Sequence, residues 1–317
     1  MTEPGLEGLS EAERAALADE LAEAELASKG EVPDPVILLT AGQPGSGKSS
    51  IGAVLASRFA GAGGVVQIDP DEIRPMLPYM DPLIEAGSLE IPEYANRDAG
   101  AIAYLLVCRM RDSRRNILLD GTLRNEDRAI SLVGDMRAAG YTVEVHGMAV
   151  YPGLSHARTY LRLAGEMDDS ESGFGRGVDD GFHDECATEF VETIKRLYTD
   201  RCVDRIVLYH LSTGVEPGVA LDVYRSGERW CPQNGSPDRT PMDVLQEAHR
   251  PSREALEAAI ATWESALEAF RDLDETEMGG KVKVHLARAR RALEQERGPP
   301  EPGLEPPDRD PEQGFER

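Results

Sequence analysis

The stretch Gly42–Ser49 reads G-Q-P-G-S-G-K-S and fits the phosphate-binding P-loop pattern G-x-x-x-x-G-K-[ST]. The apolar run Val36–Thr40 precedes it and is typical of a buried parallel strand. The residues from Ser50 to Ala56 space their apolar side chains as a helix does. A strand, a Gly-rich loop and a helix N-terminus direct backbone N–H groups and the helix dipole at one point. We therefore predict a phosphate-binding loop here rather than a chance match in a Gly-rich turn.

The loop residues have distinct expected roles. Lys48 is expected to reach the β- and γ-phosphates of a nucleotide, and Ser49 to ligate Mg²⁺. The predicted nucleotide-binding residues are Gly42, Gln43, Pro44, Gly45, Ser46, Gly47, Lys48, Ser49 and Ser50.

Composition limits the possible functions. The chain has 317 residues, of which 40% are hydrophobic, enough for one large domain or two small ones. Lysine and arginine total 34 against 58 aspartates and glutamates, a net charge of −24. Such a charge disfavours tight binding to nucleic acid, because phosphate backbones attract basic faces.

The cysteines and the N-terminus point to a cytoplasmic protein. The four cysteines form no C-x-x-C pair and have no close histidine partner typical of zinc, so we expect free thiols in a reducing compartment. The acidic N-terminus lacks the apolar core of a signal peptide. No apolar run approaches the ~20 residues that cross a bilayer, so we expect no membrane partner.

Strands and helices alternate from Val36 onward, which predicts an α/β fold: a P-loop kinase-like, doubly wound parallel sheet of about five strands with flanking helices. Ligands of such sheets bind beyond the carboxyl ends of the strands. The expected strands cover residues 36–40, 64–68, 116–119, 142–150 and 205–209, and the expected helices cover 99–111, 128–139, 155–166 and 184–198.

Helical extensions flank this core. Ser10 and Glu13 form a capping box that opens a predicted helix over 9–28. Beyond the sheet we expect a loop over 229–238, a short helix opened by 240–242, and a helical hairpin of 252–273 and 281–296 joined at Gly279-Gly280. The predicted domains are 1–31, an N-terminal helical extension; 32–252, the kinase domain; 253–297, the hairpin; and 298–317, a disordered acidic Pro-rich tail.

Acidic residues follow the second strand as Asp69-Pro70-Asp71. A carboxylate near the γ-phosphate can accept the proton of an attacking hydroxyl, so Asp71 is the predicted catalytic base. Asp69 lies closer to the strand, where it can turn inward and support it. The alternative is an acidic turn that caps the next helix.

A second acidic turn, Asp120-Gly121-Thr122, ends the third strand. A carboxylate there commonly holds Mg²⁺ through water, so Ser49 and Asp120 are the predicted metal residues. Asp120 and Thr122 are also predicted to contact the substrate. An ordinary strand-to-loop turn is the alternative.

Phosphoryl transfer also needs positive charge on the moving group. Arg162 lies in the helix after the fourth strand, and Arg176 lies between glycines in the following loop. Together they could clamp the phosphates. From spacing alone, surface charges remain the other interpretation.

With these motifs in order, the chain resembles the zeta toxins of bacterial toxin–antitoxin systems. The matching stretches span roughly Val32 to Ser252. They are G-Q-P-G-S-G-K-S from Gly42, I-D-P-D-E-I-R from Ile68, L-D-G-T from Leu119, M-A-V from Met148, Arg162, R-G-V-D-D-G-F-H-D from Arg176, and D-R-I-V-L-Y from Asp204, with a weaker T-P-M-D-V-L stretch from Thr240.

The resemblance implies a kinase that uses ATP or GTP with Mg²⁺ and phosphorylates the 3′-hydroxyl of the amino sugar of UDP-N-acetylglucosamine. It also implies a small helical antitoxin partner that blocks the nucleotide site. Lys48, Asp71, Arg162 and Arg176 match the family's catalytic positions, and Thr122 falls at a substrate contact.

One position departs from the family. Zeta toxins usually carry a substrate-binding Glu on the helix before the third strand, and here Gly100 or Asp98 takes its place, depending on the alignment. We assign Asp98 to the substrate. Its shorter side chain leaves open a kinase of another small hydroxyl compound, such as an antibiotic-modifying enzyme. A nucleotide-binding module without chemistry is a third interpretation, against which Asp71 and the two arginines argue.

Overall fold

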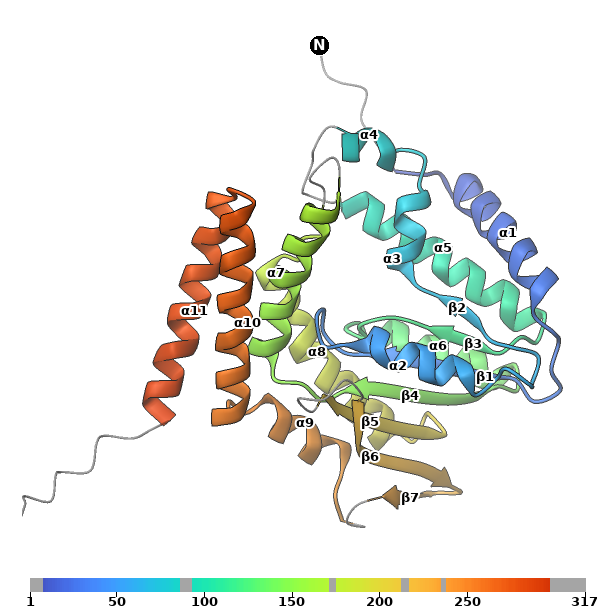
Figure 1. Ribbon diagram of the computed structural model, residues 1–317. Helices are drawn as coiled ribbons and strands as arrows, with labels where there is room; N and C mark the ends of the chain where they lie inside the picture. Colours follow the sequence, from blue (N-terminus) through green and yellow to red (C-terminus); the bar gives the residue numbers. More distant parts are fainter. Residues whose placement is uncertain (1–7, 86–92, 171–174, 212–216, 235–237, 297–317) are drawn as a thin grey trace, which may run out of the picture.

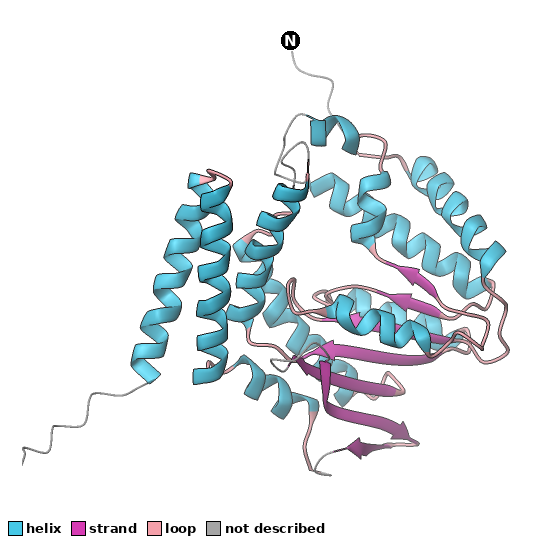
Figure 2. Ribbon diagram, viewed as in Figure 1, coloured by secondary structure: helices cyan, strands magenta, loops and turns pink. Residues whose placement is uncertain are grey.

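A seven-stranded sheet forms the centre of the molecule, and helices cover it (Figures 1 and 2). The computed structural model describes residues 8–85, 93–170, 175–211, 217–234 and 238–296. The strand order is β2-β3-β1-β4-β5-β6-β7. The first five strands are parallel, as predicted, and they are β1 (Val36–Ala41), β2 (Val66–Ile68), β3 (Ile117–Leu119), β4 (Thr142–Met148) and β5 (Arg205–Leu211).

The last two strands are antiparallel and were not predicted. They are β6 (Pro217–Ser226) and β7 (Arg229–Asn234), so the expected loop over 229–238 is wrong for most of its length. Trp230 accounts for the difference, because its indole stacks on Tyr198 at 5.1 Å and donates from Nε1 to the Tyr198 carbonyl. Pro232 is compatible with β7 because this strand lies at the edge of the sheet.

The crossover helices follow the predicted pattern with longer spans. They are α2 (Lys48–Ser57), α3 (Pro70–Ile73), a 3₁₀ turn η1 (Arg74–Met76), α4 (Met80–Glu85), α5 (Glu93–Asp112), α6 (Glu126–Ala138), α7 (Pro152–Asp169) and α8 (Asp180–Thr199). None of the helices in the described part combines the length and apolar character that a bilayer crossing requires.

The N-terminal helix α1 (Glu11–Ser28) has the predicted capping box, with Ser10 accepting from the Glu13 backbone and Glu13 accepting from Ser10. It packs along α5, as Figure 1 shows. Ala18 and Ala22 are buried in this contact, and their small side chains allow the two helices to approach closely.

The C-terminal helices form a hairpin whose turn lies earlier than predicted. After α9 (Pro241–His249), the hairpin begins with α10 (Arg253–Asp272), whose C-cap is Leu273. The second helix, α11 (Thr276–Glu296), begins before Gly279. Asp274 makes the turn with φ 57°, so Gly279-Gly280 lies inside a helix rather than in the connection. The hairpin packs on α7 through a separate apolar cluster that includes Trp263, Phe270 and Leu286. The predicted disordered tail lies outside the described residues.

A buried charge network ties α2 to the sheet. Arg58, which caps the C-terminus of α2, donates two hydrogen bonds of 2.9 and 3.1 Å to Glu144 on β4. His146 donates from Nε2 to the same carboxylate, and its Nδ1 accepts from the Tyr209 hydroxyl. Burial lowers the pKa of His146, so this ring is a neutral donor and Arg58 supplies the charge. Burial alone would raise the pKa of Glu144, but the hydrogen bonds from His146 and Arg58 outweigh it and hold that pKa at about 2.

We predict that Glu144→Gln lowers the free energy of unfolding by about 2–3 kcal/mol near neutral pH, because the buried carboxylate loses the charge that its hydrogen bonds from His146 and Arg58 stabilise. The folded-state pKa lies below the ordinary 4.5, so the contribution is complete above about pH 4.5 and is lost as the pH falls toward about 2. Urea denaturation across this range should show the gap between wild type and variant closing. The control is Glu192→Gln, whose pair with Lys195 is exposed and should matter by less than about 0.5 kcal/mol. A gap that stays constant with pH would contradict the assignment.

Candidate active site

The predicted P-loop connects β1 to α2 at the carboxyl edge of the sheet, where it wraps the start of the helix (Figure 1). Gly45 has φ +75°, and a Cβ there would lie 2.1 Å from the carbonyl oxygen of Ser155 on α7. Gly47 has φ +93° and caps α2, and a Cβ there would lie 2.7 Å from Leu211. Both positions therefore require glycine, because the backbone is left-handed and a neighbour closes the space.

The polar groups of the loop fit a bound polyphosphate. Lys48 is the first residue of α2, and its Nζ donates to the Gly42 carbonyl at 3.1 Å, so the ammonium lies over the loop. The hydroxyl of Ser46 is buried without a hydrogen-bond partner in the described structure. Ser49 is exposed on the first turn of α2, and Ser50 donates back to the Gly47 carbonyl. A helix N-terminus with an ammonium above it is an arrangement that binds phosphate.

Gln43 anchors the loop to the rest of the domain. Its buried side chain donates from Nε2 to the Val150 carbonyl at 3.0 Å and to the Ser155 hydroxyl at 3.1 Å. Ser155 also contacts Nε2 of His183 on α8 at 3.0 Å, and His183 lies 3.4 Å from Asp184. Sequence reasoning missed this chain of contacts because its members are far apart. Although it looks like a hydrolytic triad, Ser155 and His183 are fully buried, so we interpret it as support for the loop.

The carboxylates cluster at the ends of β2 and β3. Asp69 caps α3 by accepting from the Asp71 backbone N–H at 2.8 Å, which is the helix-capping turn given as the alternative for these acidic residues rather than a carboxylate turned toward the strand. Burial, helped by the charge of nearby Asp120, raises the pKa of Asp69 to about 6 despite the hydrogen bond from the Asp71 backbone. Asp120 accepts from Thr40 of β1 at 2.9 Å, so this carboxylate lies beside the strand that leads into the P-loop.

Asp71, the predicted base, is half exposed and pairs with Arg74 one turn later. It also lies within electrostatic reach of Arg176. Hydrogen bonds to Glu166 are the main cause that raises the pKa of Arg176, and the charges of Asp71 and Asp69 add to it. The predicted base and one predicted phosphate-binding arginine therefore share a neighbourhood.

Glu166 brings the two predicted arginines together. Its carboxylate accepts from Nε and Nη2 of Arg176 at 2.9 and 2.6 Å and from the Arg176 backbone at 2.7 Å. Nε of Arg162 lies 3.7 Å from the same carboxylate. One negative charge thus holds two positive ones, so this group of three side chains carries one net positive charge. The sequence signal for Glu166 was its i,i+4 spacing from Arg162.

Arg158 is a further cation that the sequence did not single out. It lies one helical turn before Arg162 on α7, next to Thr159, whose methyl would be 3.0 Å from a Cβ at Gly45. Its Nη1 is buried, and no described residue accepts a hydrogen bond from it. Burial lowers the pKa of Arg158. A buried guanidinium nitrogen without a partner is costly unless an anion binds it.

Cys186 is a common neighbour of Thr122 and of the P-loop lysine, Lys48, so these two residues lie near each other. Burial raises the pKa of this thiol to about 11, while a hydrogen bond with Thr122 and the charge of Lys48 oppose the shift. Beside it, Arg124 pairs with Glu185 at 2.9 Å. The loop after β3 therefore lies at the same carboxyl edge of the sheet as the P-loop.

Asp98 has partners other than those expected of a substrate contact. It is fully buried between α5 and α1, and it accepts from the Leu9 backbone at 2.6 Å and from the Tyr79 hydroxyl at 2.7 Å. Arg14 lies 3.2 Å away as its ion-pair partner. Gly100, the other candidate position, is exposed, and a Cβ there would meet no atom within 4 Å. The structure does not bring Asp98 into the group around Lys48 and Asp71.

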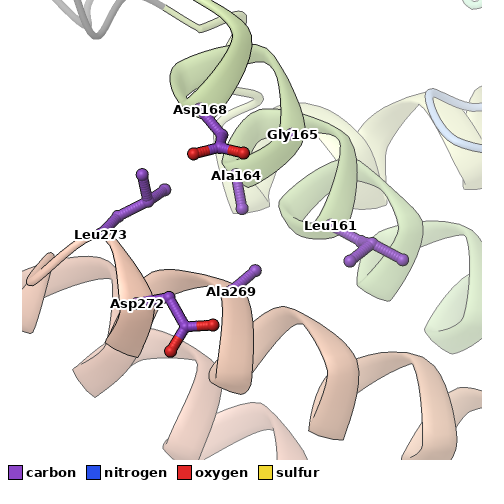
Figure 3. Close-up of a pocket in the computed structure, with 7 residues that line it drawn as sticks. All are labelled: Leu161, Ala164, Gly165, Asp168, Ala269, Asp272 and Leu273. Carbon is purple, nitrogen blue, oxygen red and sulfur yellow. The ribbon is translucent and has the colours of Figure 1, made fainter.

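A cavity of about 210 Å³ lies between α7 and α10 (Figure 3). It is lined by Leu161, Ala164, Gly165, Asp168, Ala269, Asp272 and Leu273. None of these belongs to the candidate site, so this cavity is a feature of the hairpin contact.

The parallel sheet and the P-loop at the carboxyl edge of its strands define a P-loop kinase-like protein. The family model described as zeta toxin matches residues 19–228, and the chain belongs to that family. It is 28% identical over 175 residues to Toxin PezT of Streptococcus pneumoniae, an overlap of 55% of this chain and 68% of that protein. It is 29% identical over 119 residues to Toxin zeta of Streptococcus agalactiae, covering 38% of this chain and 41% of the relative.

Solved structures share the fold. The PezAT toxin–antitoxin system of Streptococcus pneumoniae contains a chain that superposes with a TM-score of 0.65 at 23% identity, covering 84% of this chain and 99% of that one. The AvrRxo1-ORF1:ORF2 complex gives 0.55 at 14% identity, with coverage of 89% and 95%. A structure of AvrRxo1-ORF1:ORF2 with ATP gives 0.50 at 16% identity, with coverage of 87% and 86%.

We predict that Gly45→Ala lowers the free energy of unfolding by about 2 kcal/mol or more, because a left-handed residue gains a Cβ against a backbone carbonyl. Gly52→Ala is the matched control. Gly52 lies inside α2, and a Cβ added there would have no neighbouring atom within 4 Å, so alanine should stabilise by about 0.5–1 kcal/mol. Chemical denaturation measures both variants. Equal stability changes of the same sign would contradict the proposed packing of the loop on α7.

Proposed function

We propose that this protein is a phosphotransferase that moves the γ-phosphoryl group of ATP or GTP to a hydroxyl of a small acceptor. The observation that carries the proposal is the convergence of the P-loop, Asp71 and the Glu166-linked arginines on one rim of the sheet. Donor binding, proton acceptance and charge stabilisation are the three requirements of phosphoryl transfer, and these residues would meet them. A binding module would need only the first.

Each residue has a role that follows from its chemistry. The P-loop backbone and Lys48 would hold the phosphates, and Asp71 would accept the proton of the attacking hydroxyl. Arg162 and Arg176 would stabilise the charge on the transferred group, with Glu166 positioning both. Arg158 would add a cation where α7 meets the loop.

Ser49 and Asp120 are the groups that would hold Mg²⁺. A hydroxyl on the first turn of the P-loop helix and a carboxylate at the end of a neighbouring strand are hard oxygen donors, which suit this ion. The ion would supply charge neutralisation to the β- and γ-phosphates.

The acceptor we propose is UDP-N-acetylglucosamine, phosphorylated at the 3′-hydroxyl of its amino sugar. Membership of the zeta toxin family supports this choice, and Thr122, which shares the neighbour Cys186 with Lys48, would contact the acceptor. We propose that the protein is a cytoplasmic toxin with a small helical antitoxin, as the PezAT system pairs a toxin with an antitoxin. Mass spectrometry of the sugar nucleotide after incubation with protein, ATP and Mg²⁺ tests the acceptor directly.

The position of Asp98 favours a second candidate, a kinase of another small hydroxyl compound. Leu9, Tyr79 and Arg14 occupy its carboxylate, and Gly100 offers no side chain. The family's acidic contact to the amino sugar therefore has no counterpart unless the segment before α1 moves. An unchanged mass of UDP-N-acetylglucosamine, with turnover on other hydroxyl compounds, would select this second candidate.

We expect Asp71→Asn to lower kcat by about 10²–10⁴-fold while ATP binding stays near wild type, because the variant loses the proton acceptor but keeps the phosphate cradle. Lys48→Ala should lose ATP binding as well. Glu72→Gln, one residue from Asp71 and exposed, is the control and should keep its kcat. Steady-state kinetics and calorimetric ATP titration separate the two effects. A kcat near wild type in Asp71→Asn would remove Asp71 from the mechanism.

We expect Arg158→Gln to weaken ATP binding by about 10-fold or more, because a charged hydrogen bond to phosphate is lost. Its thermal stability should stay equal or rise, since a buried guanidinium nitrogen that has no hydrogen-bond partner among the described residues is removed. Arg253→Gln, which removes an exposed pair with Glu257 on α10, is the control. Unchanged ATP affinity together with a lower Tm would assign Arg158 a purely structural role.

A further inference from the structure

Three side chains from three helices converge at the contact between the C-terminal hairpin and the core. Nε2 of His156 on α7 lies 2.9 Å from one oxygen of Asp180, the first residue of α8. Nε2 of His285 on α11 lies 3.0 Å from the other oxygen of the same carboxylate. All three potential ligand atoms lie within 4.8 Å of one another. The three residues are at least 24 positions apart in the sequence, so no short sequence motif predicts the cluster.

This donor set suits a transition metal rather than magnesium. Two imidazole nitrogens and one carboxylate oxygen are the ligands of many Zn²⁺ sites, whereas Mg²⁺ prefers oxygen ligands alone. With bonds of about 2.0–2.1 Å in tetrahedral geometry, neighbouring ligand atoms lie about 3.3 Å apart. The present nitrogen-to-oxygen distances are within a few tenths of an ångström of that value. A zinc ion could therefore replace the two hydrogen bonds with small side-chain shifts.

The surroundings hold these ligands in place. The Trp263 ring stacks on His285 at 4.9 Å, and His183 stacks on His156 at 4.5 Å. The Tyr160 hydroxyl donates to Asp180 at 2.8 Å, which orients the carboxylate as an outer-shell partner would. Asp180 is 43% exposed, so an ion has a route from solvent.

We propose that His156, Asp180 and His285 form a Zn²⁺ site, with solvent completing the coordination. The site is separate from the proposed magnesium position and does not depend on the proposed kinase activity. It would join α11 to α7 and to the N-terminus of α8, and α8 begins four residues after Arg176. Zinc would thus link the hairpin to α7, which carries Arg162, and to α8, which follows Arg176 in the sequence.

The test uses the full chain, free of any histidine tag and stripped with a chelator. Equilibrium dialysis against buffered free Zn²⁺ should give one ion per chain, unaffected by excess Mg²⁺. Co²⁺ in place of zinc should give the intense visible absorption of tetrahedral coordination. At a free zinc concentration about 100 times the Kd, Tm should rise by about 4 °C relative to the stripped protein.

Asp180→Asn and His285→Gln are the decisive variants, because each keeps a polar side chain of similar size but removes a ligand. Both should bind zinc at least tenfold more weakly and lose the cobalt spectrum, while melting near stripped wild type when metal is absent. His210→Gln is the control, since His210 is exposed on β5 and outside the cluster. No zinc binding by wild type at micromolar free ion, or wild-type binding by both decisive variants, would show that the cluster is a hydrogen-bonded contact only.

Discussion

The close packing of the P-loop against α7 is the constraint on which the site depends. Gly45 leaves no room for a side chain beside the Ser155 carbonyl, and Gln43 fastens the loop to Val150 and Ser155 through buried hydrogen bonds. This contact fixes the loop relative to the helix that carries Arg158 and Arg162. Phosphoryl transfer depends on positioned charges rather than on covalent chemistry of the protein, so this packing would position the cations for the proposed reaction.

On α7 and in the loop after it, three arginines outnumber the one carboxylate, Glu166, that pairs with two of them. Glu166 compensates only part of the positive charge of Arg162 and Arg176, and Arg158 has no described partner for its buried nitrogen. The group of Arg158, Arg162, Arg176 and Glu166 therefore keeps a net positive charge even though the whole chain carries −24, and the carboxylates Asp69 and Asp71 lie within electrostatic reach of it. Net charge describes solubility and nonspecific partners, whereas the local field decides which ligand binds.

The helices outside the nucleotide core are held by polar clusters. Asp98 ties the segment before α1 to α5, and the group around Asp180 ties α11 to α7 and α8. Both clusters join segments far apart in the chain and bury charged or titratable groups. Buried polar groups need their partners, so each cluster restricts how the attached helices can move.

The sequence by itself determined the P-loop, the five parallel strands and the capping of α1, because each depends on residues within one short stretch and on local backbone preferences. Only the tertiary structure decided the partners of Asp98, the joining of Arg162 to Arg176 by Glu166, the isolation of Arg158, and the added strands β6 and β7. These features arise from contacts between segments distant in sequence. A residue pattern predicts a helix or a strand from its period, but it does not predict which side chain from a distant segment will pack against a given buried residue.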